Sequence, residues 1–149
     1  MNEDWLFPPD PDDNPRRPFD PATRAEALEA GCTEADLAAL ERLRGPARRE
    51  CLKHVVRLRR FPCELGMVEE EARRFASELD AEGNNAPVSW LDLCRPLKLR
   101  KASMDHDVKR FYCWILKRRG GALAGRLVVD SKEFRALENT GWREEATHE

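Results

Sequence analysis

The spacing of apolar residues constrains the fold of this chain more than any other feature. Residues 67–80 carry apolar side chains three or four positions apart, which places them on one face of a helix: Val68, Ala72, Phe75, Ala76 and Leu79. Stripes with similar spacing recur between residues 34 and 60 and between residues 104 and 119, separated by glycine or proline. The sequence therefore predicts a mainly α fold.

The N-terminal half predicts a helical subdomain of three to four helices over residues 21–82. Pro21 suits a first helical turn, and Gly31 suits the end of that helix. The TEAD sequence of Thr33–Asp36 resembles a capping box and predicts the start of a second helix.

A third helix is expected over residues 47–60, after the break at Gly45 and Pro46. Its apolar residues are expected to be buried (Leu52, Val55 and Val56), and its basic residues to point elsewhere (Arg48, Arg49, Lys53, Arg57 and Arg60). Residues 61–66 are expected to form a turn, and residues 80–87 a loop between two subdomains.

The C-terminal half predicts a smaller subdomain over residues 88–140. Ser89 is expected to cap a short helix, and Ser103 a helix over residues 104–119. The longer helix has an apolar stripe: Val108, Phe111, Tyr112, Ile115 and Leu116. Its other face carries mainly polar and cationic side chains: His106, Lys109, Arg110, Cys113, Trp114 and Lys117.

Glycines and β-branched residues follow that helix and predict a change of structure. Gly120 and Gly121 are expected to end the helix, and Arg126–Val129 to form a strand or part of a short β-hairpin. Asp130 is expected to cap a closing helix that contains Phe134 and Leu137.

Both ends of the chain are expected to lie outside the folded subdomains. Residues 1–20 hold five prolines among acids, which predicts an extended or disordered arm, and residues 141–149 are expected to be a flexible tail. Within the arm, Trp5, Leu6 and Phe7 form an apolar patch that is a candidate for docking on a protein partner. This patch resembles the ending of bacterial sliding-clamp ligands. The alternative is that the arm folds back and buries Trp5 on its own domain.

Charge is segregated along a chain whose net charge is only −2. Residues 42–60 and 95–126 are strongly basic, whereas residues 63–93 are acidic. This pattern indicates either separate basic and acidic faces or charged helices that pair with each other. No apolar run is long enough to span a membrane, and the acidic, proline-rich N-terminus is unlike a signal peptide. We therefore expect a cytoplasmic protein without a membrane partner.

The residues that could carry chemistry form no complete set. A metal could be bound by Cys51, His54 and Cys63, but a tetrahedral zinc site needs a fourth ligand. The sequence of such a site usually contains two pairs of closely spaced ligands, which this chain lacks. Common catalytic and phosphate-binding motifs are absent. We expect no metal, no cofactor and no enzymatic activity.

A resemblance to a known class of DNA-binding proteins rests on residues 88–138. Five pieces follow each other there: SWLDLC, RKAS, VKRFYCWILKRR, GGALAGRLVVD and SKEFRAL. In this order they resemble the small winged helix-turn-helix of phage excisionases and MerR-type regulators. The resemblance implies DNA-facing side chains at Ser103, His106, Lys109, Arg110, Trp114 and Lys117, and contacts to the DNA backbone from Arg119 and Arg126. Trp114 has a second interpretation as a core residue.

Two functions follow from these observations. The first is a small, non-catalytic regulator or excisionase-like accessory factor of bacterial or phage origin that binds double-stranded DNA. Residues 21–82 would then mediate homodimerisation or contact with a protein partner. The second is a protein-interaction module that acts by binding, such as a phage- or plasmid-borne inhibitor of a host nucleic-acid or defence complex, because a winged helix can also serve as a docking module.

Overall fold

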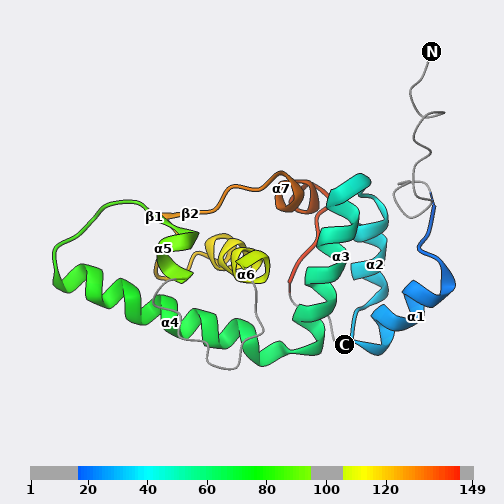
Figure 1. The fold of residues 1–149 in the computed structure, drawn as a ribbon, viewed down its shortest axis with the longest axis horizontal. Coiled ribbons are helices and arrows are strands. Elements are labelled where there is room, and N and C mark those ends of the chain that lie inside the picture. The colour runs from blue at the N-terminus through cyan, green and yellow to red at the C-terminus, as the bar shows by residue number, and fades with distance from the viewer. Residues whose placement is uncertain (1–16, 95–105, 145–149) are drawn as a thin grey trace, which may run out of the picture. The chain divides into compact units, whose positions relative to one another are not determined.

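Helices account for most of the ordered structure, which confirms the predicted mainly α fold. A computed structural model describes residues 17–94 and 106–144. Within those residues it contains seven helices and one pair of two-residue strands (Figure 1). The chain divides into two compact units. Among the described residues, unit 1 comprises 17–60 and 131–144, and unit 2 comprises 61–94 and 106–130.

This division differs from the expected boundary between residues 82 and 88. Unit 1 contains α1 (Pro21–Glu29), α2 (Glu34–Glu41), α3 (Gly45–Arg60) and α7 (Lys132–Asn139). The reason is side-chain packing: α7 packs on α3, although the two are far apart in the sequence, whereas the long helix after residue 61 packs within unit 2 (Figure 1).

Short polar motifs set the helix ends of unit 1. The capping box predicted at Thr33 is present: its hydroxyl accepts a hydrogen bond from the Asp36 N–H, and the Asp36 carboxylate accepts one from the Thr33 N–H. Gly31 follows α1 at a φ of 109°, where a side chain would be strained, and its missing Cβ would lie 3.4 Å from the Arg59 carbonyl oxygen. Ser131, and not the expected Asp130, caps α7, because its hydroxyl is the group that reaches the Phe134 N–H.

The core of unit 1 forms where α2, α3 and α7 meet. Its fully buried apolar residues include Leu37, Leu40, Cys51, Val55, Phe134 and Leu137. The His54 ring is also buried and packs edge-on against the Phe134 ring, with centroids 5.8 Å apart. The Cys51 thiol donates a hydrogen bond to the Glu133 carbonyl. Apolar packing therefore joins the two sequence segments of the unit.

Arg48 was expected to point away from the core, but it is fully buried. Its guanidinium lies 4.4 Å from the centre of the Phe19 ring and donates hydrogen bonds to the carbonyls of Glu41 and Arg17. Phe19 is itself buried. Residues 17–20 form neither helix nor strand, as an extended arm would, but they pack on unit 1 instead of lying outside it, because Arg48 needs partners in the core and this segment provides them.

Unit 2 is built on α4 (Pro62–Ala81), which begins five residues earlier than predicted. The expected turn over residues 61–66 is wrong, because Pro62 occupies the first helical turn, where its missing N–H costs nothing. The apolar stripe is confirmed at Val68, Ala72, Ala76 and Leu79, which are buried, whereas Phe75 is half-buried.

The remaining elements of unit 2 are β1 (Val88–Ser89), α5 (Trp90–Cys94), α6 (His106–Arg119) and β2 (Leu127–Val128). Helix α6 packs against both α4 and α5. The strand predicted within residues 126–129 is confirmed, but it pairs in parallel with β1, with Val88 opposite Leu127. The expected alternative of a β-hairpin is wrong, since hairpin strands are antiparallel.

Within the described residues, no helix combines the length and hydropathy needed to cross a membrane.

Candidate functional site

Helix α6, expected to face DNA, is buried along its middle. All six residues from 111 to 116 are buried, including Cys113 and Trp114, which were expected on the open face. Trp114 is only 7% exposed, and its ring centre lies 5.7 Å from that of Phe111. The DNA-facing prediction is wrong for Trp114, because packing against α4 and α5 covers more of the helix than one apolar stripe. Its second interpretation, as a core residue, is confirmed.

The polar residues of α6 lie at its two ends. His106 and Lys117 are exposed, and Lys109 is half-buried. Arg110 is also half-buried, with its guanidinium 3.6 Å from the Asp107 carboxylate and 6.0 Å from the centre of the Trp90 ring. The buried stretch from 111 to 116 separates these groups, so α6 has no continuous cationic face.

The two arginines expected to contact the DNA backbone have partners within unit 2. Arg119 lies 3.8 Å from the Glu69 carboxylate. Arg126 donates hydrogen bonds to the carbonyls of Asn84 and Ala86, and lies 3.5 Å from the Asp80 carboxylate. Arg126 thus holds the loop between α4 and β1 against β2. Ser103 and the patch of Trp5, Leu6 and Phe7 lie outside the described residues.

An exposed row of cations runs along α3 in unit 1. We define the α3 row as Arg49, Lys53, Arg57 and Arg60, of which Arg57 is half-buried and the others are exposed. Their spacings of four, four and three residues place them within roughly a quarter of the helix circumference, over roughly 16 Å of its length. Glu50, the single acid of α3, lies beside His54, with 3.7 Å between Oε2 and Nε2.

The α3 row has an energetic cost. Like charges four residues apart destabilise a helix by a few tenths of a kcal/mol per pair. The opposite face of α3, with Arg48, Cys51, Val55 and Leu58, is buried. The row therefore points away from the core of unit 1, where an anionic ligand could contact it.

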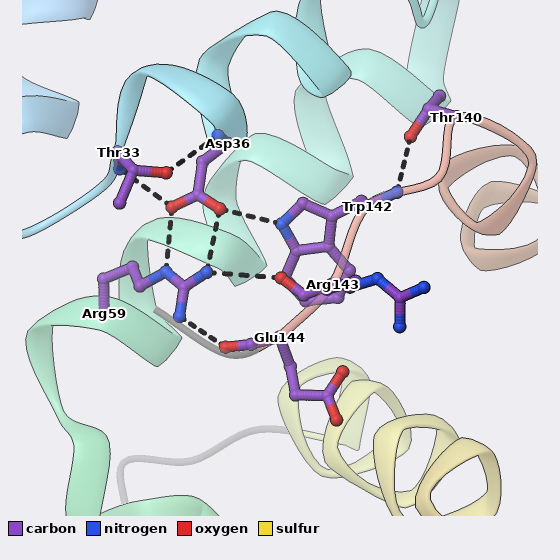
Figure 2. Close-up of polar contacts among 7 residues, drawn as sticks. All are labelled: Thr33, Asp36, Arg59, Thr140, Trp142, Arg143 and Glu144. Carbon is purple, nitrogen blue, oxygen red and sulfur yellow. Dashed lines mark hydrogen bonds and ion pairs between the residues drawn. The ribbon is translucent and has the colours of Figure 1, made fainter. Parts of the chain in front are cut away.

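A buried polar network in unit 1 centres on Asp36. Its carboxylate accepts two hydrogen bonds from the Arg59 guanidinium, one from the Trp142 indole and one from the Thr33 N–H (Figure 2). The two bonds from Arg59 are 2.8 Å long, that from Trp142 is 3.0 Å and that from Thr33 is 2.9 Å. Burial alone raises the pKa of Asp36, but the hydrogen bonds from Arg59 and its neighbours lower it below its usual value.

The same network fixes the end of the described chain. Arg59 also donates hydrogen bonds to the carbonyls of Arg143 and Glu144, and Trp142 is 3% exposed (Figure 2). The expectation of a flexible tail over residues 141–149 is therefore wrong for residues 141–144. The sequence pattern predicts Asp36 only as a member of the capping box at the start of α2. No sequence signal paired it with residues 23 and 106 positions away.

A groove lies beside this network, between α2 and residues 140–143. It has a volume of about 340 Å³ and is lined by Thr33, Ala35, Asp36, Ala38, Ala39, Arg42, Thr140, Gly141, Trp142 and Arg143. Arg42 and Arg143 are both exposed. Because the Asp36 charge is matched by Arg59, these two arginines leave the groove with a net positive charge.

The three candidate metal ligands, Cys51, His54 and Cys63, lie in different environments. Among residues 17–94 and 106–144, no three His, Cys, Asp or Glu side chains gather as metal ligands would. Cys51 and His54 are buried in unit 1, and burial raises the pKa of the Cys51 thiol to about 12, which disfavours the thiolate that a metal needs. Cys63 is exposed in unit 2.

Comparison with known proteins gives no relative from which a function could be transferred: no family model, curated protein sequence or solved structure matches this chain significantly.

Proposed function

We propose that the protein is a cytoplasmic, non-catalytic factor that binds double-stranded DNA through the phosphate backbone. The observation that carries this proposal is the α3 row, whose four cations share one outward face of a helix with a firmly buried opposite face. The role is that of a small bacterial or phage regulator or accessory factor. The interface lies on α3 and not on α6, because the middle of α6 is covered.

The α3 row supports recognition of the DNA backbone more than of base edges. Arginine and lysine neutralise phosphates, and each neutralised phosphate releases counterions. Four contacts give a slope of about −3.6 for log affinity against log salt, so the affinity should fall about 150-fold between 50 and 200 mM salt. The resemblance of residues 88–138 to a winged helix-turn-helix stays a prediction on which this interface does not depend.

Fluorescence anisotropy with a labelled 20-base-pair duplex tests the proposal on the full chain. Lys53→Glu should weaken binding about tenfold at 50 mM salt, because one phosphate contact contributes about that factor. The double variant Lys53→Glu/Arg60→Glu should reduce the salt slope to about −1.8. Circular dichroism should show unchanged helicity, since both side chains are exposed.

Two variants with the same change of charge serve as controls. Lys132→Glu changes an exposed lysine on α7 of the same unit that does not belong to the α3 row. It should weaken binding less than Lys53→Glu, since it removes none of the phosphate contacts proposed for the row. Lys117→Glu tests the end of α6. An absence of DNA binding at 50 mM salt would refute the proposal, and a larger loss from Lys117→Glu than from Lys53→Glu would move the interface to α6.

A second candidate is a protein-interaction module, such as an inhibitor of a host nucleic-acid or defence complex. It is supported by two large apolar side chains of unit 2 that are about half exposed, Leu91 at 52% and Val128 at 49%. Val128 is the register partner of Ser89, two residues before Leu91. Apolar interfaces depend weakly on salt, so a protein complex that persists at 500 mM salt and is lost in Leu91→Asp would favour this function.

A further inference from the structure

The groove between α2 and residues 140–143 has the shape and chemistry of a docking site for a short peptide segment. Its lining includes small side chains of α2, Ala35, Ala38 and Ala39, which let a bulky side chain approach the helix. The indole of Trp142 lies in its wall, with its N–H already bonded to Asp36. The groove therefore offers apolar surface, and the indole N–H in its lining already has a partner.

Two arginines set the charge that an occupant of the groove should carry. Arg42 and Arg143 belong to its lining and are exposed. The Asp36 carboxylate is matched by Arg59 at 2.8 Å, so it does not cancel them. An apolar segment with adjacent carboxylates would fit this combination, since exposed guanidinium groups attract carboxylates.

One segment of this chain has that chemistry. Glu3 and Asp4 directly precede Trp5, Leu6 and Phe7. These two acids equal the two arginines of the groove in number and are opposite to them in charge, and the apolar side chains suit the alanines of its lining.

The place where the N-terminal arm joins unit 1 brings the segment within reach of the groove. Arg48 holds residues 17–19 through the Arg17 carbonyl at 2.7 Å and the Phe19 ring. Nine residues lie between Phe7 and Arg17, and the ten steps from one Cα to the next can span up to roughly 33 Å. A unit of this size has a radius of gyration of about 10 Å, so the segment can reach most of its surface.

We propose that the Glu3–Phe7 segment docks in the groove between α2 and residues 140–143 of the same chain, with its carboxylates beside Arg42 and Arg143. The tether keeps the segment at an effective concentration on the order of millimolar, so a weak contact suffices to hold it. This proposal does not depend on DNA binding, because it involves neither the α3 row nor its ligands.

Nuclear magnetic resonance on the full chain tests the proposal. The triple variant Trp5→Ala/Leu6→Ala/Phe7→Ala should shift the Trp142 indole N–H and the amides of Ala38, Ala39 and Gly141, and leave the amides of unit 2 unchanged. A synthetic peptide of residues 1–10, added to this variant, should restore the original peak positions.

Charge reversal then locates the peptide site. Arg143→Glu in the triple-variant background should weaken peptide binding at least about fivefold, as expected for an exposed ion pair of about 1 kcal/mol. Lys132→Glu, which changes the charge of unit 1 outside the groove, should leave peptide binding unchanged.

Three results would overturn the proposal. In the first, the groove peaks are the same in the triple variant and the natural sequence. In the second, Arg143→Glu and Lys132→Glu weaken the peptide equally. In the third, the groove peaks of the natural sequence move with protein concentration, which would show that a second copy provides the segment.

Discussion

Replacing Asp36 by alanine should destabilise unit 1 severely. The Asp36 and Arg59 side chains are only 3% and 7% exposed, and two hydrogen bonds of 2.8 Å join them. Removing one partner of a buried ion pair costs about 3–5 kcal/mol, because the other charge stays buried without compensation. The change also removes the acceptor of the Trp142 indole. A unit of about 60 residues has a total stability of roughly 3–9 kcal/mol, so Asp36→Ala should bring it close to unfolding at 25 °C.

Urea unfolding followed through the α3 amide peaks measures this loss for unit 1 alone. Because Asp36→Ala could prevent folding, Asp36→Asn serves as a milder variant that retains an acceptor oxygen, and it should lose less. The double variant Asp36→Leu/Arg59→Met should be more stable than Asp36→Ala, since it leaves no buried charge. Glu34→Gln is the control: its ion pair with Arg24 is as short, at 2.6 Å, but exposed, so its effect should be far smaller.

The acidity of Asp36 predicts a pH dependence with a definite sign. Its pKa is lowered in the folded state, so the stabilisation is fully present above the unfolded value of about 3.9 and is lost as pH falls through the folded pKa. Asp36→Asn should flatten this acid limb of the stability curve. If Asp36→Ala costs less than about 1 kcal/mol, or the limb is unchanged in Asp36→Asn, the reasoning from burial and pairing is wrong.

Three further predictions concern thiol reactivity and the core of unit 2. Iodoacetamide followed by mass spectrometry should label exposed Cys63 well before Cys51, whose thiol is buried and has its pKa raised to about 12; equal rates would contradict this. Trp114→Ala should destabilise unit 2 by about 3–5 kcal/mol in urea unfolding, whereas a DNA-facing residue would tolerate the change. Tyr112→Phe should lower the stability of unit 2 by about 1.5 kcal/mol, because the hydrogen bond from Tyr112 to Glu64 is lost. An unchanged stability in thermal unfolding would show that this hydrogen bond does not stabilise the unit.

Local sequence rules predicted the elements of this fold well. The capping box at Thr33, the stripe of α4, the five buried residues of the predicted α6 stripe and the strand after Gly120 and Gly121 are all present. Each depends on residues at most four positions apart or on a single turn. Periodicity and capping act at that range, so one sequence suffices to detect them.

Long-range features could not be read from the sequence in the same way. The burial of Arg48 depends on Phe19, 29 positions earlier, and the Asp36 network depends on Arg59 and Trp142. A basic residue on a basic helix has exposure as its usual interpretation. Helical spacing places Arg48 on the face of Cys51 and Val55, but the partners that let its charge be buried there are distant in the sequence. The burial of Trp114 likewise required knowing that two helices cover α6.

The candidate DNA-binding site is proposed on α3, and not on α6 as the sequence predicted, because burial depends on long-range packing. The basic character of residues 42–60 was visible in the sequence, but its division between a buried Arg48 and an exposed α3 row required the direction of the core. The groove could not be predicted at all, since it is formed by α2 and by residues about 100 positions later.

The division of unit 1 into two sequence segments determines the order in which the two units can fold during synthesis on the ribosome. Its core needs α7, and its polar network needs residues 142–144, so it cannot be completed until residue 144 has been translated. Unit 2 is continuous and is complete once residue 130 has emerged. Closing the 70-residue connection costs roughly 4 kcal/mol of chain entropy if that connection is unfolded. If unit 2 folds first, the connection between the two segments of unit 1 becomes shorter. Folding of unit 2 therefore lowers the entropy cost of completing unit 1.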